Sequence, residues 1–171
     1  MVRQVFSDLN NFDPVSWAKE SEFLCKEIAP LIGQIFHAAV CLFCTLTMPR
    51  RAVLAAYASE ATSYQALRAS QRRDLLGLIK EGLSKVGFAN SISWPIIVVG
   101  VASGTAHDEA QGDPDYQEVL ETQAFVEEQL FAAWMHPIAH VANYLLLEKL
   151  RLFWRSGKVE WDDCFYEASA C

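Results

Sequence analysis

Positive charge is scarce in this chain and is not clustered. Of the 171 residues, 14 are Lys or Arg and 21 are Asp or Glu, which gives a formal net charge of −7. Binding to a polyanion depends on clustered cations, so this balance argues against direct binding of nucleic acid. The two basic pairs, Arg50-Arg51 and Arg72-Arg73, are too short for a localisation cluster and are expected on solvated helix faces or ends.

The sequence also lacks low-complexity segments and linkers. Its hydrophobic share of 52% excludes a disordered chain, and its length corresponds to about one domain. A chain of this length buries roughly 70% of its unfolded surface, so it needs no disulfide or metal to fold. We therefore predict one domain over residues 13–171, preceded by an extension over residues 1–12. The extension has no apolar signal-peptide core, which favours an intracellular location.

The five cysteines form no regular framework, which suits a reducing compartment. Cys41 and Cys44 have the spacing of a redox or zinc motif, but they lie inside an apolar run. Cys164 and Cys171 do not supply a second zinc pair at the usual spacing. We therefore expect Cys41 and Cys44 to pack in the core as small hydrophobes, and we expect no bound metal.

Common catalytic and phosphate-binding motifs are missing. There is no Gly-x-Ser-x-Gly elbow, and Gly100 and Gly104 are followed by no Gly-Lys pair. His136 and His140 have the spacing of two metal ligands on one helix, but Pro137 between them marks a helix start. We expect His136 to serve as a cap or polar contact and His140 to be partly buried, and we expect no cofactor.

One segment is long enough to span a bilayer. Ile28–Met48 has 21 residues without a formal charge. It also contains Pro30, Gly33, Gln34 and His37, and no aromatic belt flanks it. These features favour a helix buried on most sides of a helical domain over a membrane span.

Helix signals recur along the first half of the chain. Asp13-Pro14 combines an N-cap with a proline at the first helical position, and Pro30 can begin the next helix. Ser70 can cap a later one, with Gly87 past its end. The predicted helices of this half are residues 14 to about 29, 30–47, 52–68 and 71–86, the last with Leu75, Leu76, Ile79 and Leu83 on one face.

The second half opens with an ambiguous segment. Ile96–Val101 is rich in β-branched residues, as a buried strand would be, but a lone strand has no partner and Ser93 with Pro95 marks a helix start. We predict a helix there, followed by a loop over residues 103–113. The next predicted helix is capped by Asp113, has Pro114 in its first turn and runs to about residue 134. The last two are 137–156, ended by Gly157, and a short one over 159–166 that docks Trp161 and Phe165.

On the helix from Pro137, the residues expected to face inward are Ile138, Val141, Leu145, Leu146 and Phe153. Together these patterns predict an all-α fold, a single compact helical domain of about seven helices.

Three stretches of the sequence carry a resemblance to a known family. They are Phe36–Phe43, followed by a small polar residue and Leu46; Ile92–Gly100, which includes Trp94-Pro95; and Phe153–Gly157 with Val159–Phe165. Together they resemble the C-terminal part of the fungal-specific transcription factor domain, the helical regulatory region of fungal zinc-cluster regulators. The resemblance covers residues 24–166 and implies an all-helical fold with a buried helix at Ile96–Val101.

The chain also departs from that family. Its regulators begin with a six-cysteine zinc cluster that reads DNA, and this chain has neither such a cluster nor a basic arm before residue 13. The family domain is longer toward its N-terminus, so the chain looks like its latter part, either excised from a regulator or standing alone. The family's Gly100 helix is often followed by an arginine, whereas no arginine appears here until Arg151.

The resemblance implies a regulator-derived interaction or ligand-sensing module of fungal secondary metabolism, without its own DNA-binding element. Its partner would be another protein, a second copy or a small apolar ligand, with no membrane, and its location the nucleus or cytoplasm. The alternative is a small cyclase- or isomerase-like enzyme that folds an apolar polyketide or terpenoid-like substrate in a cavity. A third possibility is a remnant that folds without a function.

Candidate site residues follow from these alternatives. A ligand pocket would use Trp94, Trp134 and His140, although aromatics at helical spacing are also typical of a core. Acid–base chemistry would draw on the imidazole, carboxyl and phenol groups of the chain. These are His37, His107, Asp108, Tyr116, His136 and His140.

Overall fold

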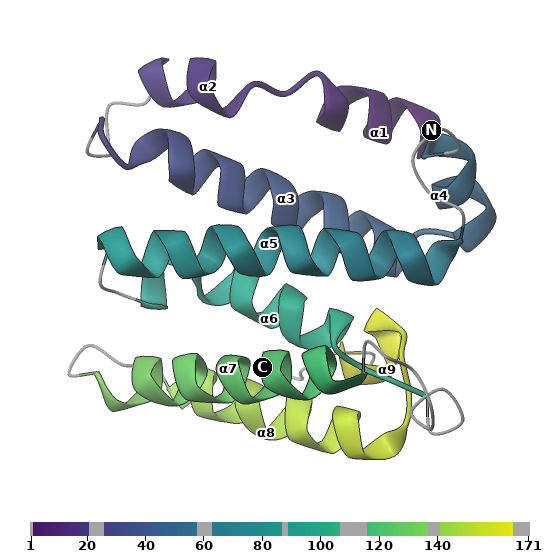
Figure 1. Ribbon diagram of the computed structural model, residues 1–171, viewed down its shortest axis with the longest axis vertical. Coiled ribbons are helices and arrows are strands. Elements are labelled where there is room, and N and C mark those ends of the chain that lie inside the picture. Colours follow the sequence, from purple (N-terminus) through teal and green to yellow (C-terminus); the bar gives the residue numbers. More distant parts are fainter. Residues whose placement is uncertain are drawn as a thin grey trace. The chain divides into compact units, whose positions relative to one another are not determined.

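The computed structural model describes residues 2–20, 26–57, 63–86, 89–106, 116–136 and 141–165. Within these residues there are nine α-helices, one 3-10 helix and no strand (Figure 1). The predicted all-α fold is therefore confirmed, with more helices than the expected seven. The chain divides into two compact units, Met1–Phe88 and Ala89–Cys171. The single domain beginning at residue 13 stays a prediction.

The N-terminal unit contains five helices. They are α1 (Val2–Asn10), α2 (Pro14–Glu20), α3 (Ala29–Thr47), α4 (Arg50–Ala56) and α5 (Tyr64–Val86). The long helices α3 and α5 pack side by side, and α1 and α2 lie along α3 (Figure 1). α4 contacts both α1 and α5. The two short N-terminal helices thus cover one side of α3, where the candidate site described below is found.

Three of the predicted helix boundaries in this unit are confirmed. The Asp13 carboxylate accepts hydrogen bonds from the backbone N–H groups of Val15 (3.0 Å) and Ser16 (3.2 Å), so it caps α2. Pro30 occupies the first turn of α3, where its missing N–H has no helical partner to lose. α3 ends at Thr47, before Pro49.

Three other boundaries were predicted wrongly. α2 ends at Glu20, and residues 26–28 form a turn, so no single helix runs from 14 to 29. The helix expected over 52–68 is instead α4 and the beginning of α5. Ser70 lies inside α5, because Ser63 supplies the cap: its Oγ accepts the N–H of Ala66 at 3.1 Å.

The first ten residues were not expected to be helical. Within α1, Phe6 is 2% exposed and its ring meets that of Tyr57 edge-on, with centroids 5.3 Å apart. Phe6 belongs to a core cluster with Cys44, Val53, Tyr57, Tyr64 and Leu67. α1 is therefore held by burial of an apolar face rather than by a sequence cap.

α3 has the length and composition to cross a membrane, since its 19 residues include no charged side chain. Half of its apolar window is buried inside the protein. A mostly apolar helix in a protein core passes the same length and composition test, so this one helix is weak evidence for a membrane span.

The C-terminal unit contains four α-helices and a 3-10 turn. They are η1 (Ala89–Ile92), α6 (Ser93–Ala102), α7 (Tyr116–Met135), α8 (Val141–Ser156) and α9 (Trp161–Phe165). α7 and α8 run antiparallel, and α6 packs on both (Figure 1). Arg151 of α8 joins the pair, because its Nε lies 2.9 Å from Glu127 of α7.

The ambiguous segment is a helix, as predicted. Every residue of α6 from Pro95 to Ala102 is buried. A helix that is apolar all round is typical of burial on all sides, and its backbone hydrogen bonds are satisfied internally. The Trp154 indole Nε1–H of α8 donates to the Gly100 carbonyl of α6 at 2.8 Å, which fastens the two helices.

The predicted inward face of α8 is wrong at two positions. Val141 is 66% exposed and Leu145 is 58% exposed. The buried positions are Asn143, Leu147, Leu150 and Phe153. Apolar residues lie on both sides of this helix, so spacing alone did not decide which side packs against α7 and α6. The predicted end is confirmed: Gly157 has φ 68°, the left-handed conformation that glycine adopts without strain.

Candidate functional site

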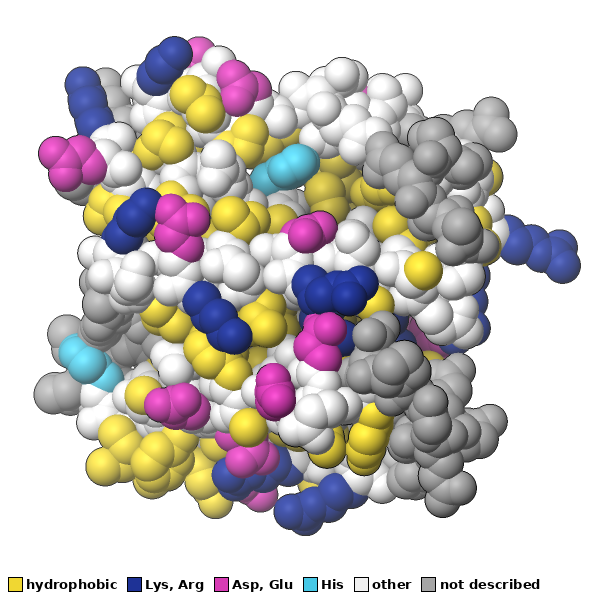
Figure 2. All heavy atoms as spheres, viewed as in Figure 1, with side chains coloured by type: hydrophobic (Ala, Val, Ile, Leu, Met, Phe, Trp, Pro, Cys, Tyr) yellow, Lys and Arg dark blue, Asp and Glu magenta, His cyan; other side chains and the backbone are white. Residues whose placement is uncertain are grey.

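An apolar groove lies between α3 and the pair α1–α2 in the N-terminal unit. We call it the α1–α3 groove. Its lining residues are Val5, Asp8, Leu9, Phe12, Trp17, Ile32, Gly33, Phe36, His37 and Val40. Its volume is about 660 Å³, within the range of small-molecule sites. In the space-filling view a histidine lies among hydrophobic side chains between these helices (Figure 2).

A glycine sets how closely α2 approaches α3. A Cβ atom placed on Gly33 would lie 2.9 Å from the Trp17 ring and 3.2 Å from the Pro14 side chain. The absence of that atom lets the indole of Trp17 rest against the α3 backbone. The Asp13 cap fixes where α2 begins and therefore where Trp17 stands.

His37 is the polar residue on the α3 side of this groove. Its Nε2 lies 2.8 Å from the carbonyl oxygen of Leu9. A carbonyl only accepts hydrogen bonds, so Nε2 carries a proton, and in the tautomer with this single ring proton the lone pair is on Nδ1. The Cys41 Sγ also approaches Nε2, at 3.6 Å. Nδ1 has no hydrogen-bond partner among the described residues.

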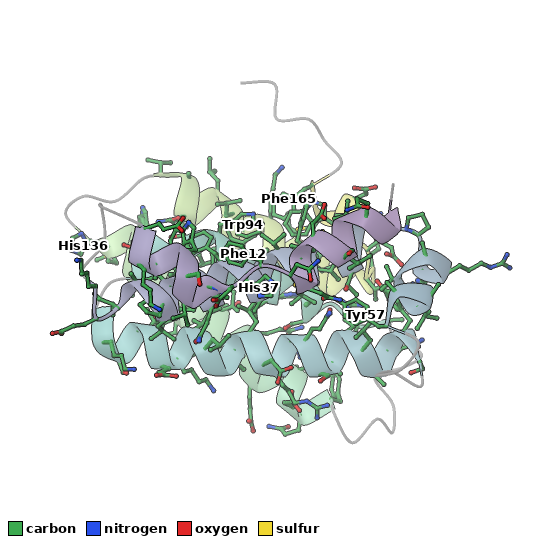
Figure 3. The ribbon with its side chains drawn as sticks, turned by 90° about the horizontal axis from the view of Figure 1, so that it is seen from above. Phe12, His37, Tyr57, Trp94, His136 and Phe165 are labelled. Carbon is green, nitrogen blue, oxygen red and sulfur yellow. The ribbon has the colours of Figure 1, made fainter. Side chains whose placement is uncertain are left out.

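Aromatic side chains line the same groove as the imidazole. The Phe12 ring lies beside it, with centroids 5.4 Å apart (Figure 3). Phe12, Trp17 and Phe36 are 40%, 39% and 36% exposed, which is high for such large apolar groups. Asp8 is the charged member of the described lining, and its carboxylate accepts a hydrogen bond from Gln4 at 2.7 Å. The groove thus combines an apolar wall, one imidazole and one peripheral carboxylate.

A second hollow, of about 570 Å³, lies between α8 and α9 in the C-terminal unit. Its lining combines two lysines and two aspartates, Lys149, Lys158, Asp162 and Asp163, with Cys164. The Lys158 Nζ lies 3.5 Å from the Asp163 carboxylate. The two lysines balance the two aspartates, so this hollow favours no particular ligand charge, and we therefore take the α1–α3 groove as the candidate site.

The two cysteines of the redox-like spacing are not reactive thiolates. Burial raises the pKa of Cys41 to about 11 and also raises the pKa of Cys44. Both are free thiols, and Cys44 belongs to the core cluster. At neutral pH both stay protonated, as expected of packing residues.

The structure describes three of the acid–base candidates. His37 lies in the α1–α3 groove, whereas Tyr116 and His136 belong to the C-terminal unit. Tyr116 begins α7 and His136 follows its last residue, so about 30 Å of helix separates them. His107, Asp108 and His140 lie outside the described residues.

The predicted ligand-binding tryptophans have other neighbours. Trp134 packs against Phe131 and Tyr144, with ring centroids 5.5 Å and 5.2 Å away. Trp94 is half-buried in the first turn of α6. Neither lines the α1–α3 groove, and their assignment to a ligand remains a prediction.

Most of the groove was missed at the level of sequence. Val5, Leu9 and Phe12 come from the segment interpreted as an extension, although their spacing of four and three residues is that of one helix face. That periodicity was the available signal. Nothing local indicated that α1 would fold back along α3, because that contact depends on residues about 28 positions apart, such as Leu9 and His37.

The fold and the groove together define the class of protein. In its described residues it is an all-α protein, and its clearest candidate site is an apolar groove with a single imidazole. No family model and no solved structure matches the chain. The chain is similar to the phomenoic acid biosynthesis cluster-specific transcriptional regulator of Leptosphaeria maculans, with 26% identity over 161 residues. The match covers 94% of this chain and 27% of that protein, so the chain spans about a quarter of its relative's length. This supports a relation to fungal regulators, while the specific transcription factor domain is not confirmed.

Proposed function

We propose that this chain is a regulatory module of a fungal transcriptional regulator of secondary metabolism. It acts by binding a ligand or a protein partner, and it carries no DNA-reading element of its own. The observation that supports this most directly is the 26% identity with a cluster-specific regulator, which extends over 94% of the chain. The all-helical fold fits the helical regulatory region predicted from the three sequence stretches.

The net charge of the chain supports a role in binding a ligand or partner rather than DNA. A net charge of −7 disfavours contact with phosphates, so recognition of DNA would belong to another part of a regulator. The apolar α1–α3 groove supplies a surface for a ligand instead. A module of a transcriptional regulator would act in the nucleus, so we propose a nuclear location.

The enzyme alternative has no comparable support. Two of its described acid–base candidates, Tyr116 and His136, lie at opposite ends of α7. Catalysis by positioned acids and bases needs such groups within hydrogen-bond reach of one substrate.

The test is a tethering experiment with the full chain. The chain is fused to a heterologous DNA-binding domain that lacks regulatory activity, and a reporter behind its binding site is measured in a filamentous fungus. We expect the fusion to change reporter output several-fold relative to the DNA-binding domain alone. Equal output from both, at matched protein levels, would refute the proposal.

A matched pair of variants controls for folding. A Cβ on Gly100 would meet Leu150 at 2.9 Å, whereas at Gly77 it meets nothing within 4 Å. Gly100→Leu is therefore expected to abolish the reporter effect, and Gly77→Leu to preserve it. A reporter effect that survives Gly100→Leu unchanged would show that the folded module is not its source.

A further inference from the structure

We propose that the α1–α3 groove binds an uncharged lipophilic small molecule with a hydroxyl group that donates a hydrogen bond to Nδ1 of His37. This inference rests on the proposed regulatory function and names the ligand class that such a module would sense. Neither the comparison with the fungal regulator nor the sequence motifs assign a ligand to this groove.

The size and lining of the groove indicate a small molecule. Its volume of about 660 Å³ lies inside the range of drug-sized sites, and nearly all of its lining is apolar. Phe12, Trp17 and Phe36 leave more than a third of their surfaces exposed around it. A lipophilic ligand would remove this aromatic surface from water, which is the main source of affinity in such sites.

The charges around the groove exclude an acidic ligand. Among its described lining residues there is no Lys or Arg to pair with a carboxylate, and Asp8 would repel one. A cationic ligand is also disfavoured, because Asp8 lies exposed at the edge and is engaged by Gln4. Exposed ion pairs contribute little, so Asp8 would not offset the desolvation of an ammonium group in an apolar site.

The imidazole determines which polar group the ligand carries. Nε2 is committed as a donor to the Leu9 carbonyl at 2.8 Å, which leaves Nδ1 as an acceptor only. A ligand group that meets Nδ1 must therefore donate, as a hydroxyl does and an ether or ketone does not. One net hydrogen bond of this kind corresponds to roughly two- to tenfold in affinity.

The test uses Nile red, an uncharged dye that fluoresces in apolar surroundings, and three competitors with the same chain: decanol, decyl methyl ether and decanoate. We expect saturable dye binding to the full chain and displacement by decanol at a concentration roughly two- to tenfold below that of the ether. Decanoate is expected to be weaker than decanol. Simple partitioning into an apolar surface would give the opposite order for alcohol and ether, because the ether is the more lipophilic.

Variants connect the result to the groove. His37→Phe keeps an aromatic ring of similar size but removes both ring nitrogens and with them the acceptor, so it should bind the dye and lose the preference for alcohol over ether. Trp17→Ala and Phe36→Ala should weaken dye, alcohol and ether alike. Phe131→Ala, which removes a 48% exposed aromatic ring of α7 in the other unit, is the matched control and should bind as the parent does. Helix content by circular dichroism checks that each variant folds.

Three results would overturn the inference: equal displacement by alcohol and ether in the parent chain, tightest binding of decanoate, or dye binding unaffected by both Trp17→Ala and Phe36→Ala. The dye-binding experiment and the tethering experiment test different proposals, so one can fail while the other succeeds. A fusion that regulates the reporter without specific dye binding rejects the ligand class alone. Alcohol-selective binding by a chain that leaves the reporter unchanged rejects the regulatory function alone.

Discussion

At the scale of single residues, two helical glycines have opposite surroundings. Gly77 of α5 faces open space, since no atom would lie within 4 Å of a Cβ there. Gly100 of α6 faces Leu150, at 2.9 Å, and Val126, at 3.2 Å. Both neighbours are 0% exposed, so their methyl groups have no free volume to move into. Glycine at position 100 is thus required by close packing of α6 on α7 and α8, whereas at position 77 it is not.

Alanine at these two positions is expected to act in opposite directions. Gly77→Ala should raise the free energy of unfolding by about 0.5–1 kcal/mol, because alanine loses less backbone entropy in a helix. Gly100→Ala should lower it by about 1–3 kcal/mol through overpacking. Urea unfolding of the two variants and the parent measures both values. A stabilised Gly100→Ala variant would contradict the packing described here.

Trp154 offers a second prediction at this scale. Its indole N–H donates at 2.8 Å to the Gly100 carbonyl, near the C-terminal end of α6, and this carbonyl also accepts the backbone N–H of Ser103 at 3.2 Å. Trp154→Phe keeps most of the ring and removes the donor, so the free energy of unfolding should fall by about 1–2 kcal/mol. Equilibrium unfolding measures this loss. An unchanged stability would mean that water replaces the indole at no cost.

At the scale of elements, the start of α2 depends on one carboxylate. The hydroxyl of Ser16, at 2.6 Å, and the backbone N–H of Val15 donate to Asp13 and hold its pKa below the ordinary value of 3.8. A lowered folded-state pKa stabilises the fold above the unfolded-state value, and this contribution is lost as the pH falls through the folded-state value. Because α2 carries Trp17, the same cap positions one wall of the α1–α3 groove.

The Asp13→Asn variant tests this dependence on pH. Asparagine can still cap the helix but does not titrate. The stability advantage of the parent over the variant should be constant above about pH 5 and should shrink as the pH falls below it. Thermal unfolding of both proteins across this range measures the difference. A difference that is independent of pH down to full protonation would contradict the role of the charged carboxylate.

The elements also show where local patterns suffice. Pro30 and Pro49 bracket α3, and Gly157 ends α8, because each acts through its own backbone geometry. Ser63 and Ser70 are equally good caps by residue type, and the structure shows that Ser63 is the one used.

At the scale of the whole molecule, the question is whether the two compact units unfold together. A single domain predicts one cooperative transition, and Gly100→Ala should shift all of it downward by about 2–4 °C per kcal/mol. The described part of the chain allows two probes, since Trp17 is in the N-terminal unit and Trp94, Trp134, Trp154 and Trp161 are in the other. Tryptophan fluorescence and helix ellipticity should therefore report the same midpoint. Midpoints that separate in the variant would establish two domains.

The candidate site was only partly predictable. His37 was among the acid–base candidates, and it does lie in the groove, where its Nε2–H donates to the Leu9 carbonyl and most of the other lining residues are apolar. Phe12 belonged to no motif, and Phe36 was noted only as the first residue of the stretch Phe36–Phe43. Their importance comes from being large, exposed and adjacent in space, which a one-dimensional pattern does not report.

The sequence by itself determined that the chain is helical, where several helices begin and end, and that its surface disfavours a polyanion, because periodicity, caps and net charge are local or additive properties. Only the tertiary structure decided that Val2–Asn10 folds along α3, that Val141 and Leu145 face solvent, and that α1, α2 and α3 enclose a groove around His37. Burial depends on contacts between residues far apart in the chain. Which apolar face of a helix is buried is therefore determined by the packing of the whole chain and not by the local sequence.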